Sequence, residues 1–209
     1  MNNLINKIQS KIKSNIFLDY DMRKSTWFRA GGNALGYVIV NSISDLKTII
    51  SYSDQIKYYI VGVGSNLMVR DGGYDGLIIK LGKNFNKIKI NKDTLSVGAG
   101  VLDINLAKFA LKNSIKDYEF FSGIPGTIGG AIKMNAGCFG SQTEDNLKRI
   151  LVINKLGKIK YLTKDELELK YRSSNLTDEF IILKADFSFK YSSVSEIMQK
   201  NNYIKLKRE

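Results

Sequence analysis

The chain has 209 residues and a mass of 23.5 kDa, enough to bury a sizeable core in one large domain or two small lobes. Its composition, 44% hydrophobic and 25% charged, is that of a folded globular protein. There is no histidine and one cysteine, Cys138, which excludes an internal disulfide, a Cys/His zinc site and Ser-His-Asp or Cys-His catalysis. We therefore expect no metal site. Any chemistry would depend on a bound cofactor or on carboxylate, hydroxyl, Lys and Arg groups.

The net charge of +12 at pH 7 suggests a nucleic-acid partner, because clustered Lys and Arg neutralise phosphates. The excess is nearly all Lys, however, and it is spread along the chain with heavy use of Ile and Asn. This pattern indicates a general compositional bias, and we predict no nucleic-acid partner. A basic surface would still attract an anionic small molecule.

The N-terminal segment, residues 1–23, is predicted to be an amphipathic helix. Its isoleucines recur at helical spacing among Lys and Asn, at Ile5, Ile8, Ile12 and Ile16. It lacks the continuous apolar run of a signal peptide, and no stretch approaches the roughly 18 apolar residues of a membrane span. We expect a cytoplasmic protein with no membrane partner.

Residues 24–82 are predicted to form a first lobe, and glycine-rich turns separate its apolar runs. The expected elements are strands at 35–40 and 58–61, a helix from Ser44 to Asp54 between them, and strands at 67–69 and 77–79 joined as a hairpin by the turn 71–76.

Residues 83–191 are predicted to form a second lobe, and residues 192–209 a helical connection to a C-terminal domain that this sequence lacks. Alternating strands and helices in both lobes indicate an α+β fold. The expected elements of the second lobe are strands at 88–90 and 94–97, a helix at 102–113, strands at 149–154 and 158–162, a short capped helix at 163–167 and a strand at 180–189.

A first candidate site follows the strand predicted at 58–61 and reads Gly62-Val63-Gly64-Ser65-Asn66. Its glycines let backbone N–H groups approach a phosphate, and Ser65 and Asn66 add side-chain donors. It lacks the Lys-Ser/Thr of a Walker loop and the third glycine of a dinucleotide fingerprint. Taken alone the segment is a weak signal, and a tight turn between strands is the favoured interpretation.

A second candidate site contains the chain's one proline, Pro125, in a nine-residue segment, 122–130, with four glycines. Proline fixes its own φ angle, so this segment is expected to hold a special backbone shape. Met134-Asn135-Ala136-Gly137 follows it directly. Two glycine-rich loops in different lobes suit the two ends of an extended dinucleotide, and paired structural turns are the alternative.

Arg172 is a third candidate, in the run Tyr171-Arg172-Ser173-Ser174. It is one of six arginines in a chain that otherwise uses Lys, which indicates that its planar fork binds a carboxylate or phosphate. A surface arginine is the alternative. Cys138 is interpreted as a small packed residue, because no neighbouring base would activate its thiol.

Together these segments resemble the UDP-N-acetylenolpyruvoylglucosamine reductase family of flavoenzymes, also called UDP-N-acetylmuramate dehydrogenases. The resemblance runs from about Lys24 to the chain end. Six segments carry it in order: Thr26-Trp27-Phe28-Arg29-Ala30-Gly31-Gly32, Gly62-Val63-Gly64-Ser65-Asn66-Leu67, residues 71–76, residues 123–131, Met134-Asn135-Ala136-Gly137 and Tyr171-Arg172-Ser173-Ser174.

The resemblance implies a two-lobed FAD-binding module of the vanillyl-alcohol-oxidase (PCMH) type, with FAD held non-covalently between the lobes. It further implies that one set of residues cradles the pyrophosphate and another lines the FAD and approaches the isoalloxazine. The first set is Gly62, Gly64, Ser65, Asn66 and Leu67, and the second is Gly123, Ile124, Pro125, Gly126, Thr127, Gly129, Gly130, Asn135, Ala136 and Gly137.

The reaction that the resemblance implies is reduction of UDP-N-acetylglucosamine enolpyruvate to UDP-N-acetylmuramate in peptidoglycan synthesis, with NADPH as hydride donor. Arg172 matches the family's active-site arginine, which engages the enolpyruvyl carboxylate, and Tyr171 is a substrate-contact candidate. The partner is then a UDP-sugar substrate.

The sequence departs from the family pattern where protonation is concerned. The family's third domain carries a proton-donating serine in a Gly-Ser-x-Phe motif and a late glutamate, and neither motif is present here. Cys138 and Phe139 stand where the family often has Ala and Tyr. Three readings follow: a truncated reductase, an FAD-binding remnant that needs a separately encoded C-terminal domain, or another FAD oxidoreductase of the same fold.

Overall fold

The computed structural model describes residues 2–207, which fold as two compact units. Unit 1 comprises Met1–Asn84 with Ile153–Lys158, and unit 2 comprises Phe85–Val152 with Ile159–Glu209. The predicted N-terminal and C-terminal segments are parts of these units. No helix within residues 2–207 is long and apolar enough to cross a membrane.

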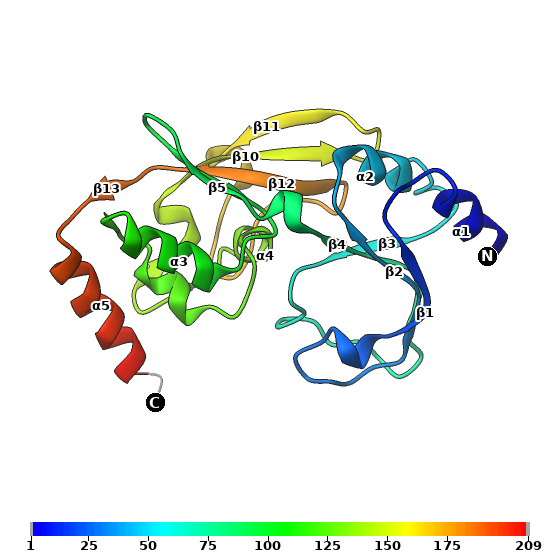
Figure 1. Cartoon of the computed structure of the whole chain (residues 1–209), viewed down its shortest axis with the longest axis horizontal. Helices are drawn as coiled ribbons and strands as arrows, with labels where there is room; N and C mark the ends of the chain where they lie inside the picture. Colours follow the sequence, from blue (N-terminus) through cyan, green and yellow to red (C-terminus); the bar gives the residue numbers. More distant parts are fainter. Residues whose placement is uncertain (1, 208–209) are drawn as a thin grey trace. The chain divides into compact units, whose positions relative to one another are not determined.

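Unit 1 is built on a four-stranded sheet in the order β1-β2-β4-β3 (Figure 1). Strand β1 pairs antiparallel with β2, whereas β2 and β3 both run parallel to β4. Apolar side chains including Met22, Tyr37 and Ile78 form a core at this sheet. The elements are α1 (Asn2–Gln9), β1 (Ile16–Asp21), β2 (Asn33–Val40), α2 (Ile43–Ile50), β3 (Tyr58–Val61) and β4 (Tyr74–Leu81).

The predicted N-terminal helix of residues 1–23 is only 8 residues long in the structure. Helix α1 ends at Gln9, and Ile16 begins β1, where it pairs with Val38. The chain turns between them because the buried Asp45 carboxylate accepts hydrogen bonds from the Ser14 N–H at 2.8 Å and the Ser14 hydroxyl at 2.7 Å. The isoleucine spacing did not reveal this turn, since β-branched residues also suit strands.

The predicted hairpin around residues 71–76 is wrong. Residues 67–69 form no strand, and β4 pairs with its neighbours in parallel. The chain instead reverses in a tight turn closed by the bond from the Gly73 N–H to the Arg70 carbonyl at 2.9 Å. The same carbonyl accepts the Gly32 N–H at 2.9 Å, which ties this turn to the chain ahead of β2. Helix α2 is capped by the Ser42 hydroxyl rather than by Ser44.

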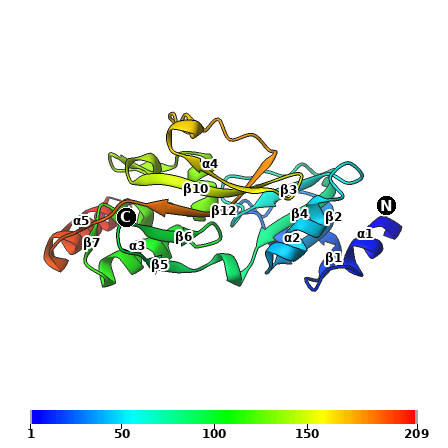
Figure 2. The same ribbon diagram turned by 90° about the horizontal axis from the view of Figure 1, so that it is seen from above.

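Unit 2 is built on a five-stranded sheet in the order β11-β10-β12-β6-β5, drawn side by side in Figure 2. Helix α4 packs against β12 and β6, and α5 packs against α3. The aromatic rings of Tyr118, Phe121 and Phe187 meet in its core. The elements are β5 (Ile88–Ile90), β6 (Leu95–Gly98), α3 (Asp103–Lys112), α4 (Ile128–Lys133), β10 (Leu147–Asn154), β11 (Ile159–Thr163), β12 (Phe180–Phe187) and α5 (Val194–Leu206), with two-residue strands β7 (Ile115–Lys116), β8 (Gly137–Cys138), β9 (Ser141–Gln142) and β13 (Lys190–Tyr191).

The strands and helices expected in the second lobe are found in the expected order, but helix α4, which begins inside the Pro125 segment, was not predicted. The short capped helix is a 3-10 turn at Asp165–Leu167. The Thr163 hydroxyl accepts the Glu166 N–H at 3.4 Å, and the Glu166 carboxylate accepts the Thr163 N–H at 2.7 Å. This reciprocal pair of bonds has the pattern of a capping box. The C-terminal helix, α5, begins at a Ser193 side chain that caps the Glu196 N–H.

Candidate functional site

The glycine loop at residues 62–66 lies in unit 1, directly after β3 as predicted. Gly64 has a φ of +70°, and a Cβ there would lie 2.1 Å from the Ser25 carbonyl oxygen. The Trp27 N–H donates to the Gly64 carbonyl at 3.0 Å. Glycine is therefore required here by the close approach of residues 25–27 alone.

The loop also presents backbone donors. Within residues 2–207 no protein acceptor is found for the N–H groups of Gly64, Ser65 and Asn66. Unpaired N–H groups on a glycine-containing turn form a concave site for an anion such as a phosphate. The geometry thus supports both readings of this loop, the tight turn and the phosphate cradle.

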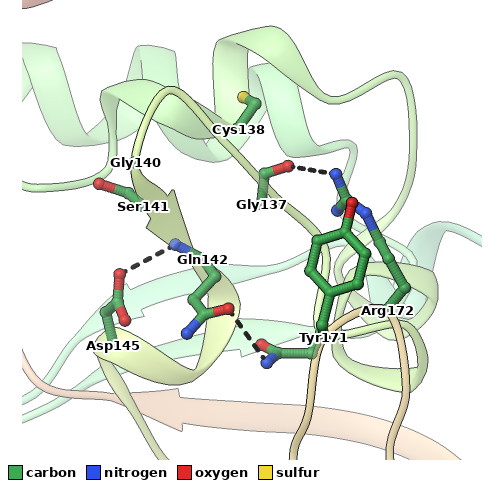
Figure 3. A pocket seen from close by; sticks show the side chains of 9 residues that line it. Gly137, Cys138, Gly140, Ser141, Gln142, Asp145, Tyr171 and Arg172 are labelled. Atoms are coloured by element: carbon green, nitrogen blue, oxygen red, sulfur yellow. Dashed lines mark hydrogen bonds between the residues drawn. The ribbon is translucent and has the colours of Figure 1, made fainter.

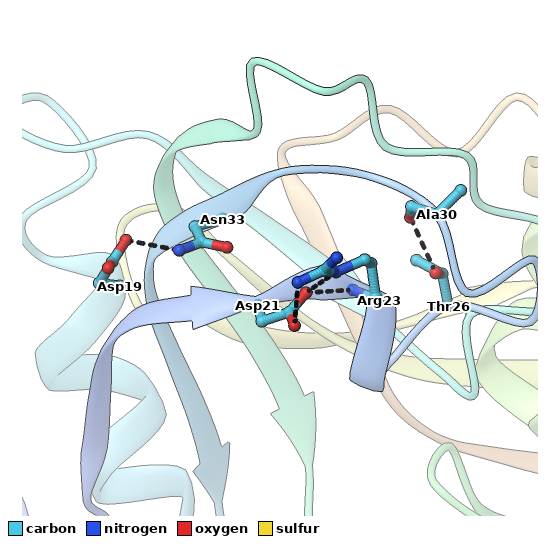
Figure 4. A network of polar contacts seen from close by, with 6 residues as sticks. All are labelled: Asp19, Asp21, Arg23, Thr26, Ala30 and Asn33. Atoms are coloured by element: carbon cyan, nitrogen blue, oxygen red, sulfur yellow. Dashed lines mark hydrogen bonds and ion pairs between the residues drawn. The ribbon is translucent and has the colours of Figure 1, made fainter.

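The neighbouring chain from Asp19 to Asn33 is held by short polar contacts (Figure 4). The Asp21 carboxylate accepts the Arg23 N–H at 3.0 Å and its Nε at 2.9 Å, and the Thr26 hydroxyl donates to the Ala30 carbonyl at 3.1 Å. These bonds fix the segment that packs on Gly64.

The loop around Pro125 lies in unit 2 and is a tight turn centred on the proline. The Gly126 N–H donates to the Ile124 carbonyl at 3.0 Å, the i to i+2 bond of a γ-turn. An inverse γ-turn needs a central φ near −75°, which the proline ring supplies. This explains why the single proline of the chain stands here.

Three glycines of this loop are closely packed within unit 2. A Cβ at Gly123 would lie 2.7 Å from the Cys138 sulfur, one at Gly126 would lie 2.5 Å from Asp103 Oδ2, and one at Gly129 would lie 3.1 Å from the Ala99 carbonyl oxygen. Cys138 is therefore packed beside the loop, as expected.

Gly130 is different. A Cβ there would meet only Thr127 Oγ1, at 3.6 Å, and the residue is exposed although it lies within α4. Glycine inside a helix costs about 0.5–1 kcal/mol relative to alanine. Nothing in the described chain uses the space that this glycine leaves, so it is available to a ligand.

Asp103 is a buried acid beside this loop that the sequence analysis missed. It begins α3, its N–H donates to the Gly126 carbonyl at 3.1 Å, and its side chain is fully buried. Neither carboxyl oxygen has a hydrogen-bond partner within residues 2–207. Burial raises the pKa of Asp103 to about 8, so the group is protonated at neutral pH.

The third predicted segment lines a pocket of about 390 Å³ in unit 2 (Figure 3). One wall is the hairpin of β8 and β9, closed by Phe139 and Gly140 with φ angles of +53° and +81°. Positive φ at both central residues is the signature of a type I′ turn. The lining residues are Asn135, Gly137, Cys138, Gly140, Ser141, Gln142, Asp145, Tyr171 and Arg172.

Arg172 stands on a two-residue turn. Lys170 and Ser173 exchange backbone hydrogen bonds, both at 3.1 Å, and Arg172 between them has a φ of +55°. That left-handed conformation costs a non-glycine residue about 1 kcal/mol. Its Nη2 donates to the Gly137 carbonyl at 2.8 Å, and its guanidinium lies 5.3 Å from the centre of the exposed Tyr171 ring.

The structure therefore brings Asn135 and Gly137, which were predicted to line the cofactor, to one pocket with Tyr171 and Arg172, which were predicted to contact the substrate. Ala136 stabilises the local fold instead. Its N–H donates to the Ala131 carbonyl, and its carbonyl accepts hydrogen bonds from the N–H and the hydroxyl of Thr143. Ser141, Gln142 and Asp145, which also line the pocket, were not predicted from the sequence. Their place directly after the Asn135–Gly137 run was the signal that could have found them.

A family model for an FAD binding domain matches residues 34–163. The UDP-N-acetylenolpyruvoylglucosamine reductase of Pelagibacter ubique is 39% identical over 98% of this chain, which spans 68% of that protein. The chain belongs to the UDP-N-acetylenolpyruvoylglucosamine reductase family. The family resemblance that was inferred from the motifs at Gly62, Pro125 and Arg172 is thus confirmed.

Solved structures agree with membership of the reductase family. The UDP-N-acetylenolpyruvylglucosamine reductase of Thermus caldophilus superposes with a TM-score of 0.81 at 28% identity, covering 94% of this chain and 69% of that one. The 6-hydroxy-D-nicotine oxidase of Arthrobacter nicotinovorans shares the fold alone, with a TM-score of 0.64 at 17% identity over 86% of this chain and 43% of that one. The fold is the FAD-binding module of the vanillyl-alcohol-oxidase type, as predicted.

The residues present fit an FAD. Unit 1 offers the unpaired N–H groups of Gly64, Ser65 and Asn66, which suit a phosphate. Unit 2 offers open space at Gly130. The assignment of individual contacts to the predicted cofactor residues stays a prediction.

The unused space at Gly130 leads to a first prediction. Gly130→Ala should raise the free energy of unfolding of the FAD-free chain by about 0.5–1 kcal/mol and weaken FAD binding. Gly126→Ala, the control, should lower stability because its Cβ meets Asp103. Urea unfolding and FAD titration measure both effects, and unchanged FAD affinity in Gly130→Ala would contradict the ligand explanation of this glycine.

The buried acid leads to a second prediction. The folded-state pKa of Asp103 is raised from 3.8 to about 8, so its contribution to stability is complete below pH 4 and is lost as pH rises toward 8. The loss is about 1.4 kcal/mol for each pH unit. Asp103→Asn should remove this decline, and parallel urea-unfolding profiles of the two proteins between pH 4 and 8 would refute it.

The turn at Arg172 leads to a third prediction. Arg172→Ala and Arg172→Gly both delete the guanidinium, but only glycine adopts a φ of +55° without strain. The free energy of unfolding of the glycine variant should be about 1 kcal/mol higher than that of the alanine variant. Chemical denaturation tests this, and an alanine variant as stable as the glycine variant would show that the turn relaxes.

Proposed function

We propose that this chain is an FAD-dependent reductase that converts UDP-N-acetylglucosamine enolpyruvate to UDP-N-acetylmuramate in peptidoglycan precursor synthesis. NADPH is the proposed hydride donor. The observation that carries the proposal is Arg172, held by a strained turn at a pocket formed by the segment that follows the Pro125 loop, in a member of this reductase family.

Arg172 is suited to the enolpyruvyl carboxylate. A guanidinium has five N–H donors in a planar fork. Within residues 2–207 this side chain donates to the Gly137 carbonyl alone, which leaves donors that match a carboxylate. The charge that develops as the double bond accepts hydride spreads toward that carboxylate, where a fixed cation stabilises it. FAD, when bound, supplies the hydride transfer.

Other pocket groups place the substrate rather than react with it. The exposed Tyr171 ring is proposed as a contact for the UDP-sugar. Asp145, which also lines the pocket, accepts a hydrogen bond from the Gln142 N–H at 2.9 Å (Figure 3).

A second candidate function rests on the absence of a Gly-Ser-x-Phe sequence from the 209 residues. In this reading the 209 residues bind FAD and substrate, and a C-terminal domain outside them supplies the proton. Loss of a general acid typically costs 10²–10⁴-fold in rate.

The purified chain should bind close to one FAD per protein, and NADPH should reduce that FAD. Substrate-dependent NADPH oxidation, with UDP-N-acetylmuramate identified by mass, tests the proposed reaction. Arg172→Ala should lower it by about 100-fold or more. Arg149→Ala is the control, because Arg149 pairs with Asp186 outside the pocket.

The outcomes separate the candidates. A colourless chain that cannot be reconstituted with FAD would refute both. An FAD-bound chain that NADPH reduces, but that shows no substrate-dependent turnover until a C-terminal domain is added, would favour the second candidate over the first.

A further inference from the structure

Asn135 is predicted from the sequence to line the cofactor, yet its side chain is occupied inside the protein. It is 2% exposed and has a φ of +40°. Its Nδ2 donates to the Lys170 carbonyl at 3.2 Å and to Gln142 Oε1 at 3.4 Å, and its Oδ1 accepts the Glu144 N–H at 3.0 Å. A primary amide offers two donors, and both are engaged.

The bond to Lys170 reaches the turn that carries Arg172. Lys170 is the first residue of that turn, and its N–H and carbonyl both close the turn against Ser173. The Asn135 amide therefore holds the base of the turn, while Gly137, two residues further along, holds its tip through the Arg172 guanidinium.

A third tether extends the same pattern. The Ser174 hydroxyl donates to the Lys133 carbonyl at 2.8 Å, and Lys133 Nζ donates to the Leu176 carbonyl. Residues 133, 135 and 137 thus each bond to the segment from 170 to 176. Asn135 is the one buried side chain among these tethers, so its bond is shielded from competing water.

We propose that Asn135 is a positioning residue for Arg172: its buried amide anchors the Lys170 carbonyl and thereby sets the direction in which the guanidinium is presented to an anionic ligand. Its effect on the enolpyruvyl substrate rests on the proposed function. Its effect on the turn itself rests on the geometry alone.

Asn135→Asp isolates the donor. Aspartate tolerates left-handed backbone and keeps the oxygen that accepts the Glu144 N–H, but it replaces the donor to Lys170 with an acceptor. Asn146→Asp is the matched control, because Asn146 Nδ2 also donates to a backbone carbonyl in unit 2, that of Asp117 at 2.9 Å. Asn135→Gly, which suits the φ of +40°, replaces Asn135→Asp if that variant fails to fold.

The first measurement needs no ligand. Limited digestion of the whole chain with trypsin, quantified by mass spectrometry, reports opening of the turn through cleavage after Lys170 and Arg172. Asn135→Asp should speed these cleavages about tenfold, from the loss of one buried hydrogen bond, and Asn146→Asp should not. Unchanged rates in Asn135→Asp would overturn the proposal, whatever the reaction of the protein.

The second measurement is a double-mutant cycle on the dissociation constant of UDP-N-acetylglucosamine enolpyruvate, read from the absorbance of bound FAD. Asn135→Asp should weaken binding, and adding it to Arg172→Ala should weaken binding no further, because both act through one guanidinium. Additive losses would overturn the proposal. Loss of FAD with unchanged trypsin rates would also overturn it and would assign Asn135 to the cofactor. If the wild type binds no substrate, the proposed function fails and the trypsin result still decides.

Discussion

Close approach of one backbone segment to another is the constraint on which both units depend. In unit 1 a side chain at Gly64 or Gly73 would collide with the backbone oxygen of Ser25 or Asn33, at 2.1 and 1.9 Å respectively. In unit 2 a side chain at Gly98 would collide with the Phe85 oxygen at 2.0 Å. These approaches bring loops that are distant in sequence into contact, so the glycines determine where the loops run. Gly64, Gly123, Gly126 and Gly137 of the candidate segments are thus closely packed, whereas a Cβ at Gly130 would meet only Thr127 Oγ1.

Three residues in the walls of the pocket also carry backbone strain. Asn135, Phe139 and Arg172 all have positive φ angles, and all three belong to the segments that form its walls. Each strained residue costs about 1 kcal/mol or more and persists because surrounding bonds hold it. At Arg172 these bonds are the turn, the Gly137 carbonyl and, behind them, the buried amide of Asn135.

Much of this arrangement could be predicted from the sequence. The strand before Gly62, the turn at Pro125 and the special character of Arg172 follow from residue type and local order. The two predictions that were wrong depend on tertiary contacts. The turn fixed by Asp45 shortens α1, and β4 pairs in parallel where the glycines at 72 and 73 predicted a hairpin. Local pattern cannot distinguish these outcomes, because the partners that decide them lie some thirty or more residues away. Asp103 was missed for a related reason, since an acidic residue at a helix start is ordinarily a solvated one.

The amount of this protein in a cell depends on two features that only a ligand can use. These are the open space at Gly130 and the unpaired N–H donors of Gly64, Ser65 and Asn66. They contribute nothing to the stability of the FAD-free chain. Each stabilises the folded state only when a ligand occupies the space or accepts the hydrogen bonds. A ligand that binds the folded state alone adds stability in proportion to the logarithm of its free concentration over its dissociation constant. The lifetime of this polypeptide is therefore coupled to the supply of flavin, and a shortage of the cofactor would reduce the amount of the protein as well as its occupancy.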